Sequence, residues 1–245
     1  MTDPHVLWLD HVVVLVSNLA AAEASFERAG FILGRRGAHA ALGTRNRLVM
    51  LEGAYLELLA VDVPTAGNER YRELLDEHGG AVGVALHSVD LVTTAAALDA
   101  RGIAHGPPAS VARPIDTGIS PSVAQFRLLT IDARLTPGSF AFYCEHRTPA
   151  LVWETHAAHR NGATRVTALA APPAVRAGLS QLGDIETART AGTRAEQIAL
   201  RDEAAKGSPW TIGFAASNEL IYEDEVLPAR LAMLPRARER PGQSQ

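Results

Sequence analysis

The chain begins with an alternation of apolar runs and polar segments that predicts a strand, a helix and further strands. Residues 9–16 read LDHVVVLV, which is typical of a buried strand that carries one histidine, His11. Ser17 or Asn18 can cap the helix that follows. A glycine-punctuated polar segment then precedes two more apolar strands, and the last of these, residues 55–61, carries a single carboxylate, Glu57.

His11 and Glu57 stand out because both are polar residues in otherwise apolar strands. Side chains alternate between the two faces of a strand, so both can point into one cavity. Burying either group is costly unless it is paired, hydrogen-bonded or bound to a metal. The pattern therefore predicts either a buried hydrogen-bonded pair or a metal site.

The same order of elements returns after a linker, residues 64–80, that contains a short polar helix. Residues 8–63 form the first βαβββ unit and residues 81–155 the second, which makes an internal repeat. Aligning the two predicted helix starts places Gly83 where the first unit has His11.

Residues 163–225 predict a C-terminal extension and a possible third, degenerate unit. No histidine or carboxylate occupies the matching place in its first strand, so we expect it to complete a sheet or to form a subunit contact. Residues 235–245 are expected to be a solvated, mobile tail. The length of the chain and the unpaired third unit favour a homodimer.

Composition narrows the class of protein. Hydrophobic residues make up 47% of the chain and charged residues 20%, as in globular proteins. A net charge of -4 gives no electrostatic basis for binding nucleic acid or an anionic membrane. The single cysteine, Cys144, excludes an internal disulfide and fits a reducing compartment. We find no signal peptide and no apolar run of about 20 residues, and we expect a cytoplasmic protein.

Several motifs of the two units together resemble the vicinal oxygen chelate (glyoxalase/bleomycin resistance/extradiol dioxygenase) superfamily, and more closely its glyoxalase-like domain family. They are LDHVV from residue 9, GTRN from residue 43, YLELL from residue 55, and EHRTP followed by LVW between residues 145 and 153. The resemblance implies an α+β fold in which tandem βαβββ modules form an open half-barrel cup. The C-terminal extension would be of similar build.

In superfamily members with a metal, a divalent ion sits in the cup, held by His and Glu of the first and last strands. By this resemblance His11, Glu57 and either His146 or Glu145 would hold zinc, iron, manganese or nickel. Glu57 would also be the catalytic carboxylate. We expect His146, unless a one-residue bulge turns Glu145 inward. The aligned position of the second unit, Gly83, has no side chain to offer.

Further polar residues are candidates for binding a substrate. Arg113 and Arg127 could each hold a carboxylate through two parallel hydrogen bonds. Arg127 is favoured, although it could equally lie on the outer face. Asn46 could bind substrate, but anchoring a turn through its amide is the favoured interpretation. His39 could border the cup, and the solvated interpretation is slightly favoured.

The sequence is compatible with three functions, which we rank from the most to the least favoured. The first is a metal-dependent enzyme of the isomerase, lyase or dioxygenase type that acts on a small oxygenated molecule. The second is a metal-free protein that binds or sequesters a small molecule in the same cup, which the glycine at position 83 supports. The third is a structural or interaction module whose cup is filled by its own side chains. One architecture can host all three.

Overall fold

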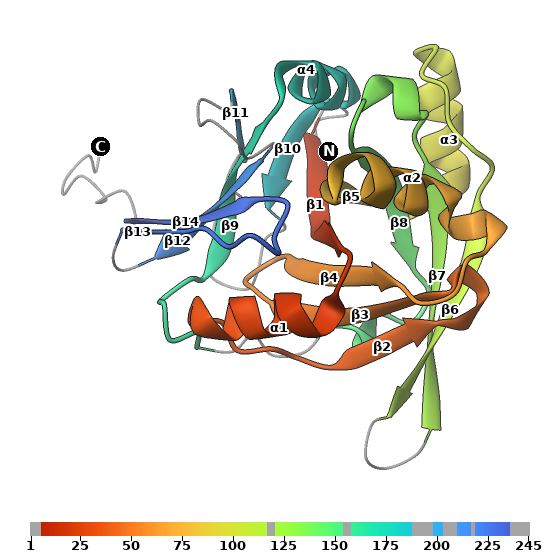
Figure 1. The fold of residues 1–245 in the computed structure, drawn as a ribbon. Coiled ribbons are helices and arrows are strands. Elements are labelled where there is room, and N and C mark those ends of the chain that lie inside the picture. The colour runs from red at the N-terminus through yellow and green to blue at the C-terminus, as the bar shows by residue number, and fades with distance from the viewer. Residues whose placement is uncertain are drawn as a thin grey trace, which may run out of the picture.

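The polypeptide folds as two βαβββ modules followed by a C-terminal extension (Figure 1). The computed structural model describes residues 6–116, 121–153, 158–187, 198–202, 210–216 and 219–235. Module 1 consists of β1 (Val6–Val16), α1 (Leu19–Arg28), β2 (Arg36–His39), β3 (Thr44–Met50) and β4 (Tyr55–Val61). A linker with α2 (Glu69–His78) leads to module 2. Module 2 consists of β5 (Gly80–His87), α3 (Leu91–Ala100), β6 (Ala109–Asp116), β7 (Pro121–Thr130) and β8 (Phe140–His146).

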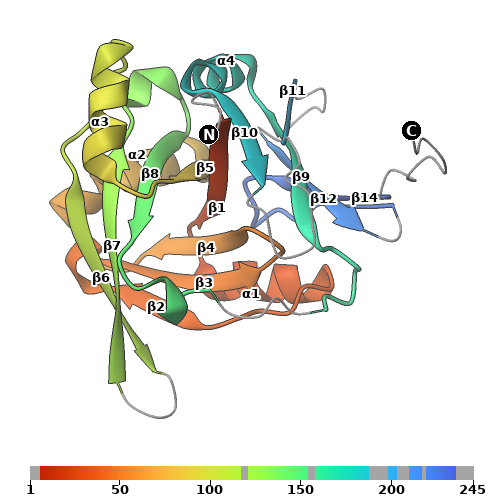
Figure 2. The ribbon, with the colours of Figure 1, turned by 180° about the vertical axis from the view of Figure 1, so that it is seen from behind.

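The strands of both modules form one curled sheet in the order β2-β3-β4-β1-β5-β8-β7-β6. β1 is parallel to β4 and antiparallel to β5, and β5 is parallel to β8, so the modules join along β1 and β5. The curl brings the two end strands, β2 and β6, into contact (Figures 1 and 2). The resulting α+β cup is the predicted architecture.

Alternation along the strands separates the two faces of this sheet. Val12 and Val14 of β1 belong to an apolar cluster that also holds Phe26 of α1 and Leu98 of α3. Val13 belongs to a second cluster on the opposite face. The two helices therefore cover the outer face, and the inner face is left to the cup. Of the two predicted caps of α1, Asn18 is the one observed, and its side chain accepts a hydrogen bond from the backbone N–H of Ala21.

The strand register shows how the two modules correspond at the centre of the cup. Val13 of β1 lies opposite Glu57 of β4 on one side and opposite Gly83 of β5 on the other. The strands β5 and β8 of module 2 correspond to β1 and β4 of module 1. With these pairings, Gly83 is the counterpart of His11, and Phe142 is the counterpart of Glu57. A Cβ atom at position 83 would overlap the ring of Phe140. Module 2 therefore fills with apolar groups the place where module 1 presents polar ones.

The pairing of β1 with β5 is interrupted at one point. Leu9 pairs with Leu86 and His11 with Ala85, so Asp10 is an extra residue on β1 with no partner of its own. Such a bulge breaks the strict alternation and re-aims a side chain. Asp10 and His11 are therefore free to interact although they are neighbours in sequence.

The C-terminal extension contains β9 (Arg165–Ala171), α4 (Pro173–Leu182), β10 (Asp184–Thr187), β11 (Ala199–Asp202), β12 (Thr211–Ala216), β13 (Leu220–Tyr222) and β14 (Arg230–Pro235). β10 pairs in parallel with the start of β1, which extends the main sheet. The other strands form a second sheet in the order β11-β9-β12-β14-β13, seen beside the cup in Figure 2. The predicted mobile tail lies, except for Pro235, outside the described residues. No helix in the described part of the chain is long and apolar enough to cross a membrane.

Candidate functional site

A cavity opens to solvent on the inner face of the curled sheet, and the empty space in it, counted together with the solvent space at its mouth, is about 530 Å³. Strands of both modules line it, and its apolar wall combines aliphatic side chains with the aromatic rings of Tyr55, Tyr71, Phe126 and Phe142. The polar side chains that line it are His11, His39, Thr44, Asn46, Glu57 and Arg113. Most of the residues predicted to form the site thus share one cavity, and the exceptions are Arg127 and His146.

His11 and Glu57 lie together at the base of this polar set. His11 Nε2 is 3.4 Å from Glu57 Oε2, and the His11 ring stacks on Tyr55 with ring centroids 4.5 Å apart. Burial alone would lower the pKa of His11, but hydrogen bonds with Asp10 and Glu57 raise the pKa to about 9. Burial alone would raise the pKa of Glu57, but the hydrogen bond with His11 and its charge lower it to about 2. By themselves the two side chains form a buried ion pair.

Asp10 contacts the ring nitrogen of His11 that points away from Glu57, and its carboxylate also contacts two other imidazole rings. Its Oδ1 is 2.6 Å from His11 Nδ1, and its Oδ2 is 2.9 Å from His146 Nε2 and 3.3 Å from His87 Nδ1. The Asp10 side chain is fully buried, and burial alone would raise its pKa, but these hydrogen bonds hold the pKa well below its usual range. Asp10 therefore fixes the orientation of His11 and leaves His11 Nε2 to face the cavity.

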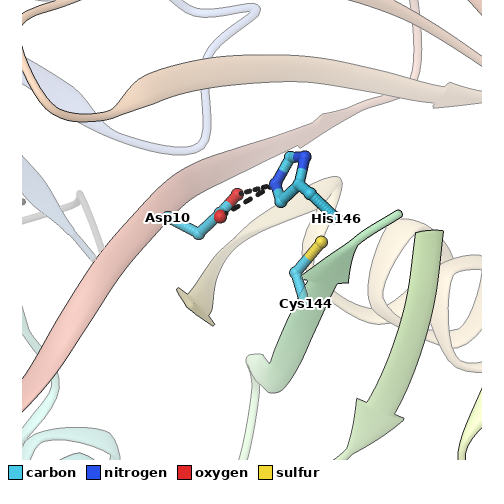
Figure 3. Close-up of side chains that lie close together, drawn as sticks. All are labelled: Asp10, Cys144 and His146. Atoms are coloured by element: carbon cyan, nitrogen blue, oxygen red, sulfur yellow. Dashed lines mark hydrogen bonds and ion pairs between the residues drawn. The ribbon is translucent and has the colours of Figure 1, made fainter. Parts of the chain in front are cut away.

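Figure 3 shows that His146 approaches Asp10 from β8, with Cys144 beside it. Potential ligand atoms of these side chains lie within 4.8 Å of one another, the one group of three or more that close among the described residues. Burial raises the pKa of the Cys144 thiol, and Asp10 already serves several imidazoles. This chemistry favours hydrogen bonding over metal binding. His146 is thus hydrogen-bonded to Asp10. The ligand atoms of the predicted set, His11, Glu57 and His146, do not lie within 4.8 Å of one another.

His39 and Asn46 both face Glu57. His39 is 9% exposed, its Nδ1 is 3.0 Å from Thr44 Oγ1, and its Nε2 is 4.0 Å from Glu57 Oε1. Burial lowers the pKa of His39. Asn46 lies within β3 rather than at a turn, and its Nδ2 donates to Glu57 Oε1. The solvated interpretation of His39 and the turn interpretation of Asn46 are therefore wrong, because both side chains point into the cup.

Arg113 enters the cavity from β6. Its side chain is buried, and Nη1 donates to Asn46 Oδ1 over 3.4 Å. Through Asn46, Arg113 joins module 2 to Glu57 of module 1.

Arg127 and Glu145 lie on the outer face. Arg127 Nη1 is 3.3 Å from Glu145 Oε2, and Glu145 also accepts a hydrogen bond from the backbone N–H of Leu91 at the start of α3. β8 has no bulge in its pairing with β7, so the alternation that turns Cys144 inward turns Glu145 outward. The inward orientation that would let Arg127 hold a substrate is thus not observed. Glu145 is likewise excluded as the alternative ligand by its place behind the sheet.

Asp10 and His87 are the neighbours of the site that sequence reasoning missed. Strict alternation places Asp10 on the face opposite His11, and only the bulge brings the two together. A usable signal did exist, because a carboxylate in an apolar strand next to a histidine requires a partner when buried.

The geometry of His11, His39 and Glu57 can be tested against a divalent ion. Two ligand atoms that each lie about 2.1 Å from a shared ion are at most about 4.2 Å apart. His11 Nε2 is 3.4 Å from Glu57 Oε2 and His39 Nε2 is 4.0 Å from Glu57 Oε1, so each pair meets this limit through a different oxygen. The three residues together do not bring one ligand atom each within 4.8 Å of the others. Metal-binding histidines usually donate their second ring N–H to an oxygen, as these do toward Asp10 and Thr44. The donor types suit a divalent ion, but the three side chains would have to move closer together to hold one.

Comparisons with known proteins agree with this architecture. A sequence model of the glyoxalase-like domain matches residues 9–182. The comparison with curated proteins finds no match. Among solved structures, a hypothetical protein from Staphylococcus aureus is similar with a TM-score of 0.65 and 15% identity, over 94% of this chain and 99% of that one. Methylmalonyl-CoA epimerase from Mycobacterium tuberculosis is similar with a TM-score of 0.47 and 22% identity, over 61% of this chain and 95% of that one. At these identities the structural likeness concerns the fold alone.

Proposed function

Because this chain belongs to the glyoxalase-like domain family of the vicinal oxygen chelate superfamily, we propose that it is a divalent-metal-dependent enzyme acting on a small oxygenated molecule. The reaction would be of the isomerase, lyase or dioxygenase type. The observation that carries the proposal is that His11, His39 and Glu57 line one cavity, with both imidazoles beside the Glu57 carboxylate.

In this proposal His11 Nε2, His39 Nε2 and Glu57 would draw together to hold the ion, and His39 would take the place that the sequence suggested for His146. When bound, a zinc, iron, manganese or nickel ion with open coordination positions supplies a Lewis acid that polarises a carbonyl or enolate oxygen. Sites with two imidazoles and one carboxylate leave such positions open.

The protein's own contribution is to orient these groups and to exclude water. Asp10 holds His11 Nδ1, and Asn46 holds Glu57 Oε1. Glu57 remains an ionised carboxylate down to low pH because its pKa is about 2. The aromatic wall, which includes Phe126 and Phe142, lowers the local dielectric and so strengthens each electrostatic contact in the cavity.

A second candidate function is a metal-free protein that binds or sequesters a small molecule in the same cavity. The replacement of both polar positions in module 2, by Gly83 and Phe142, supports it. A purely structural module has less support, because its own side chains leave the cavity open.

The test is the metal content of protein purified without a chelator or a His-tag. We expect about one divalent ion per chain in the wild type, and loss of the ion in His11→Ala, His39→Ala and Glu57→Gln. His78→Ala is the matched control, since His78 is exposed on α2. His146→Ala separates the two candidate third ligands, because it should keep the ion if His39 is the ligand.

Protein that contains no metal, and that takes up none when nickel, manganese, iron or zinc is added, would contradict the enzyme proposal. It would leave the small-molecule binding function as the better account of the cavity.

A further inference from the structure

Arg113 is a buried cation without a matching anion. It is 4% exposed, and no carboxylate of the described residues lies within 4 Å of its guanidinium. Within the described part of the chain it makes one side-chain hydrogen bond, to Asn46 Oδ1, which is long at 3.4 Å, and its buried Nε has no partner there. A guanidinium carries five N–H donors in a planar fork, and Arg113 presents this fork to the cavity. Burying such a group is costly unless a ligand completes its contacts.

The backbone makes room for this side chain. Gly37 of β2 lies where the two end strands of the sheet meet, and a Cβ atom there would be 2.5 Å from Arg113 Cδ. The same Cβ would also overlap Asn46 Oδ1. Any residue other than glycine would therefore push Arg113 away from Asn46. The absence of a side chain at Gly37 thus leaves the space that the Arg113 side chain occupies in the cavity.

We propose that the cavity takes a small organic acid whose carboxylate binds the guanidinium of Arg113. The rest of the molecule would reach toward His11 and Glu57, the other polar groups of the same cavity. The planar fork of arginine matches the two oxygens of a carboxylate. This inference rests on the proposed function, because it names the class of molecule that the same site accepts.

The charges around the cavity agree with an acid. Asp10 and Glu57 are anionic, and Arg113 is cationic. Histidines that bind a metal are neutral. With a divalent ion in place, the sum of these charges is +1, which a monocarboxylate cancels.

The experiment compares acids with their neutral esters. Pyruvate, malonate and benzoate are titrated into the protein by calorimetry, each beside its methyl ester, with inorganic phosphate as a further arm. We expect at least one acid to bind and to raise the Tm, with its ester at least tenfold weaker. Arg113→Gln should weaken that acid at least tenfold. Arg127→Gln should leave it unchanged, since Arg127 lies on the outer face.

Equal binding of acid and ester, full binding by Arg113→Gln, or binding of phosphate but of none of the acids would overturn the inference. So would the failure of every acid to bind at millimolar concentration. Gly37→Ala supplies an independent check, because the added Cβ displaces Arg113 and should weaken the acid as Arg113→Gln does.

The ligand-free protein gives a second measurement. An arginine kept for structure stabilises the fold, whereas a buried charge that waits for a ligand does not. We therefore expect ligand-free Arg113→Gln to have a Tm equal to or above that of the wild type. A clear loss of Tm in this variant would show that Arg113 serves the fold.

The failure of this inference is distinct from that of the proposed function. If chelator-treated protein binds an acid through Arg113 but never takes up metal, the enzyme proposal fails and the acid site stands. If metal is bound through His11 but esters bind as well as acids, the acid site fails and the enzyme proposal stands.

Discussion

At the scale of single residues, the chemistry of the cup depends on which atom of His11 is free. Asp10 occupies Nδ1 at 2.6 Å, so Nε2 is the atom that faces Glu57. The sequence identified His11 and Glu57 because each is a lone polar residue in an apolar strand. It showed that a buried Asp10 would require a partner but not that this partner is His11, because their contact depends on a bulge that no residue type indicates.

Asp10→Asn tests this positioning role. The amide keeps the shape of the carboxylate but no longer accepts as a charged partner, so His11 loses its strongest orienting contact. We expect metal affinity, measured by competition with a chelating dye, to fall by about 10–100-fold. His87→Gln is the control, because His87 contacts the same carboxylate from a partly exposed position away from the cavity. Equal affinity in Asp10→Asn and wild type would contradict the role.

Gly83 offers a second residue-scale prediction. A Cβ atom at this position would overlap the Phe140 ring, which packs against the glycine. Gly83→Ala should therefore lower the free energy of unfolding in urea by about 1–3 kcal/mol. Phe140→Leu in the same chain should recover part of that loss, because it removes the overlapping atoms. Additive losses in the double variant would show that the two side chains do not compete for this space.

At the scale of elements, alternation predicted β8 well and β1 less well. Without a bulge in its pairing with β7, β8 turns Phe142 and Cys144 into the cup and Glu145 outward, as simple counting suggests. The orientation of Arg127 in β7 could not be chosen from sequence, because Phe126 and Leu128 on either side of it are apolar and face the cavity. In the structure, the ion pair with Glu145 places the Arg127 side chain on the outer face of the sheet.

Glu145 links β8 to the start of α3, and this contact can be tested. Glu145 is 3% exposed, and it accepts the backbone N–H of Leu91, a group that the helix itself cannot satisfy. Burial alone would raise the pKa of Glu145, but this hydrogen bond and those of the neighbouring arginines lower it. We expect Glu145→Ala to cost about 1–3 kcal/mol in urea unfolding, since it leaves a buried donor unpaired. Glu77→Ala, on an exposed part of α2, should change little, and equal effects would contradict the capping role.

At the scale of the whole molecule, the C-terminal extension is part of the same body as the cup. The sequence left open whether residues 163–225 complete a sheet or contact another subunit. Part of the answer is visible in β10, which joins the main sheet along β1. A second connection runs through Asp224, which lies beyond β13 and pairs with Arg28 of α1 at 2.6 Å. Pairings between such distant segments leave no periodic signal in either one, which is why the sequence could not predict them.

The contribution of Asp224 to the stability of this contact depends on pH. Burial alone would raise its pKa, but hydrogen bonds from Ser25, the Val226 N–H and Arg28 lower it from the ordinary value of 3.8 to about 2. A depressed carboxyl pKa stabilises the folded state above the unfolded pKa, and the contribution is lost as the pH falls through the folded pKa. We therefore expect Asp224→Asn to lower the free energy of unfolding by about 1 kcal/mol at pH 6, because the pair is partly exposed. The difference from wild type should shrink between about pH 4 and pH 2. Urea unfolding at several pH values provides the measurement, and a difference that stays constant down to pH 2 would show that the Asp224 carboxylate does not contribute through its charge.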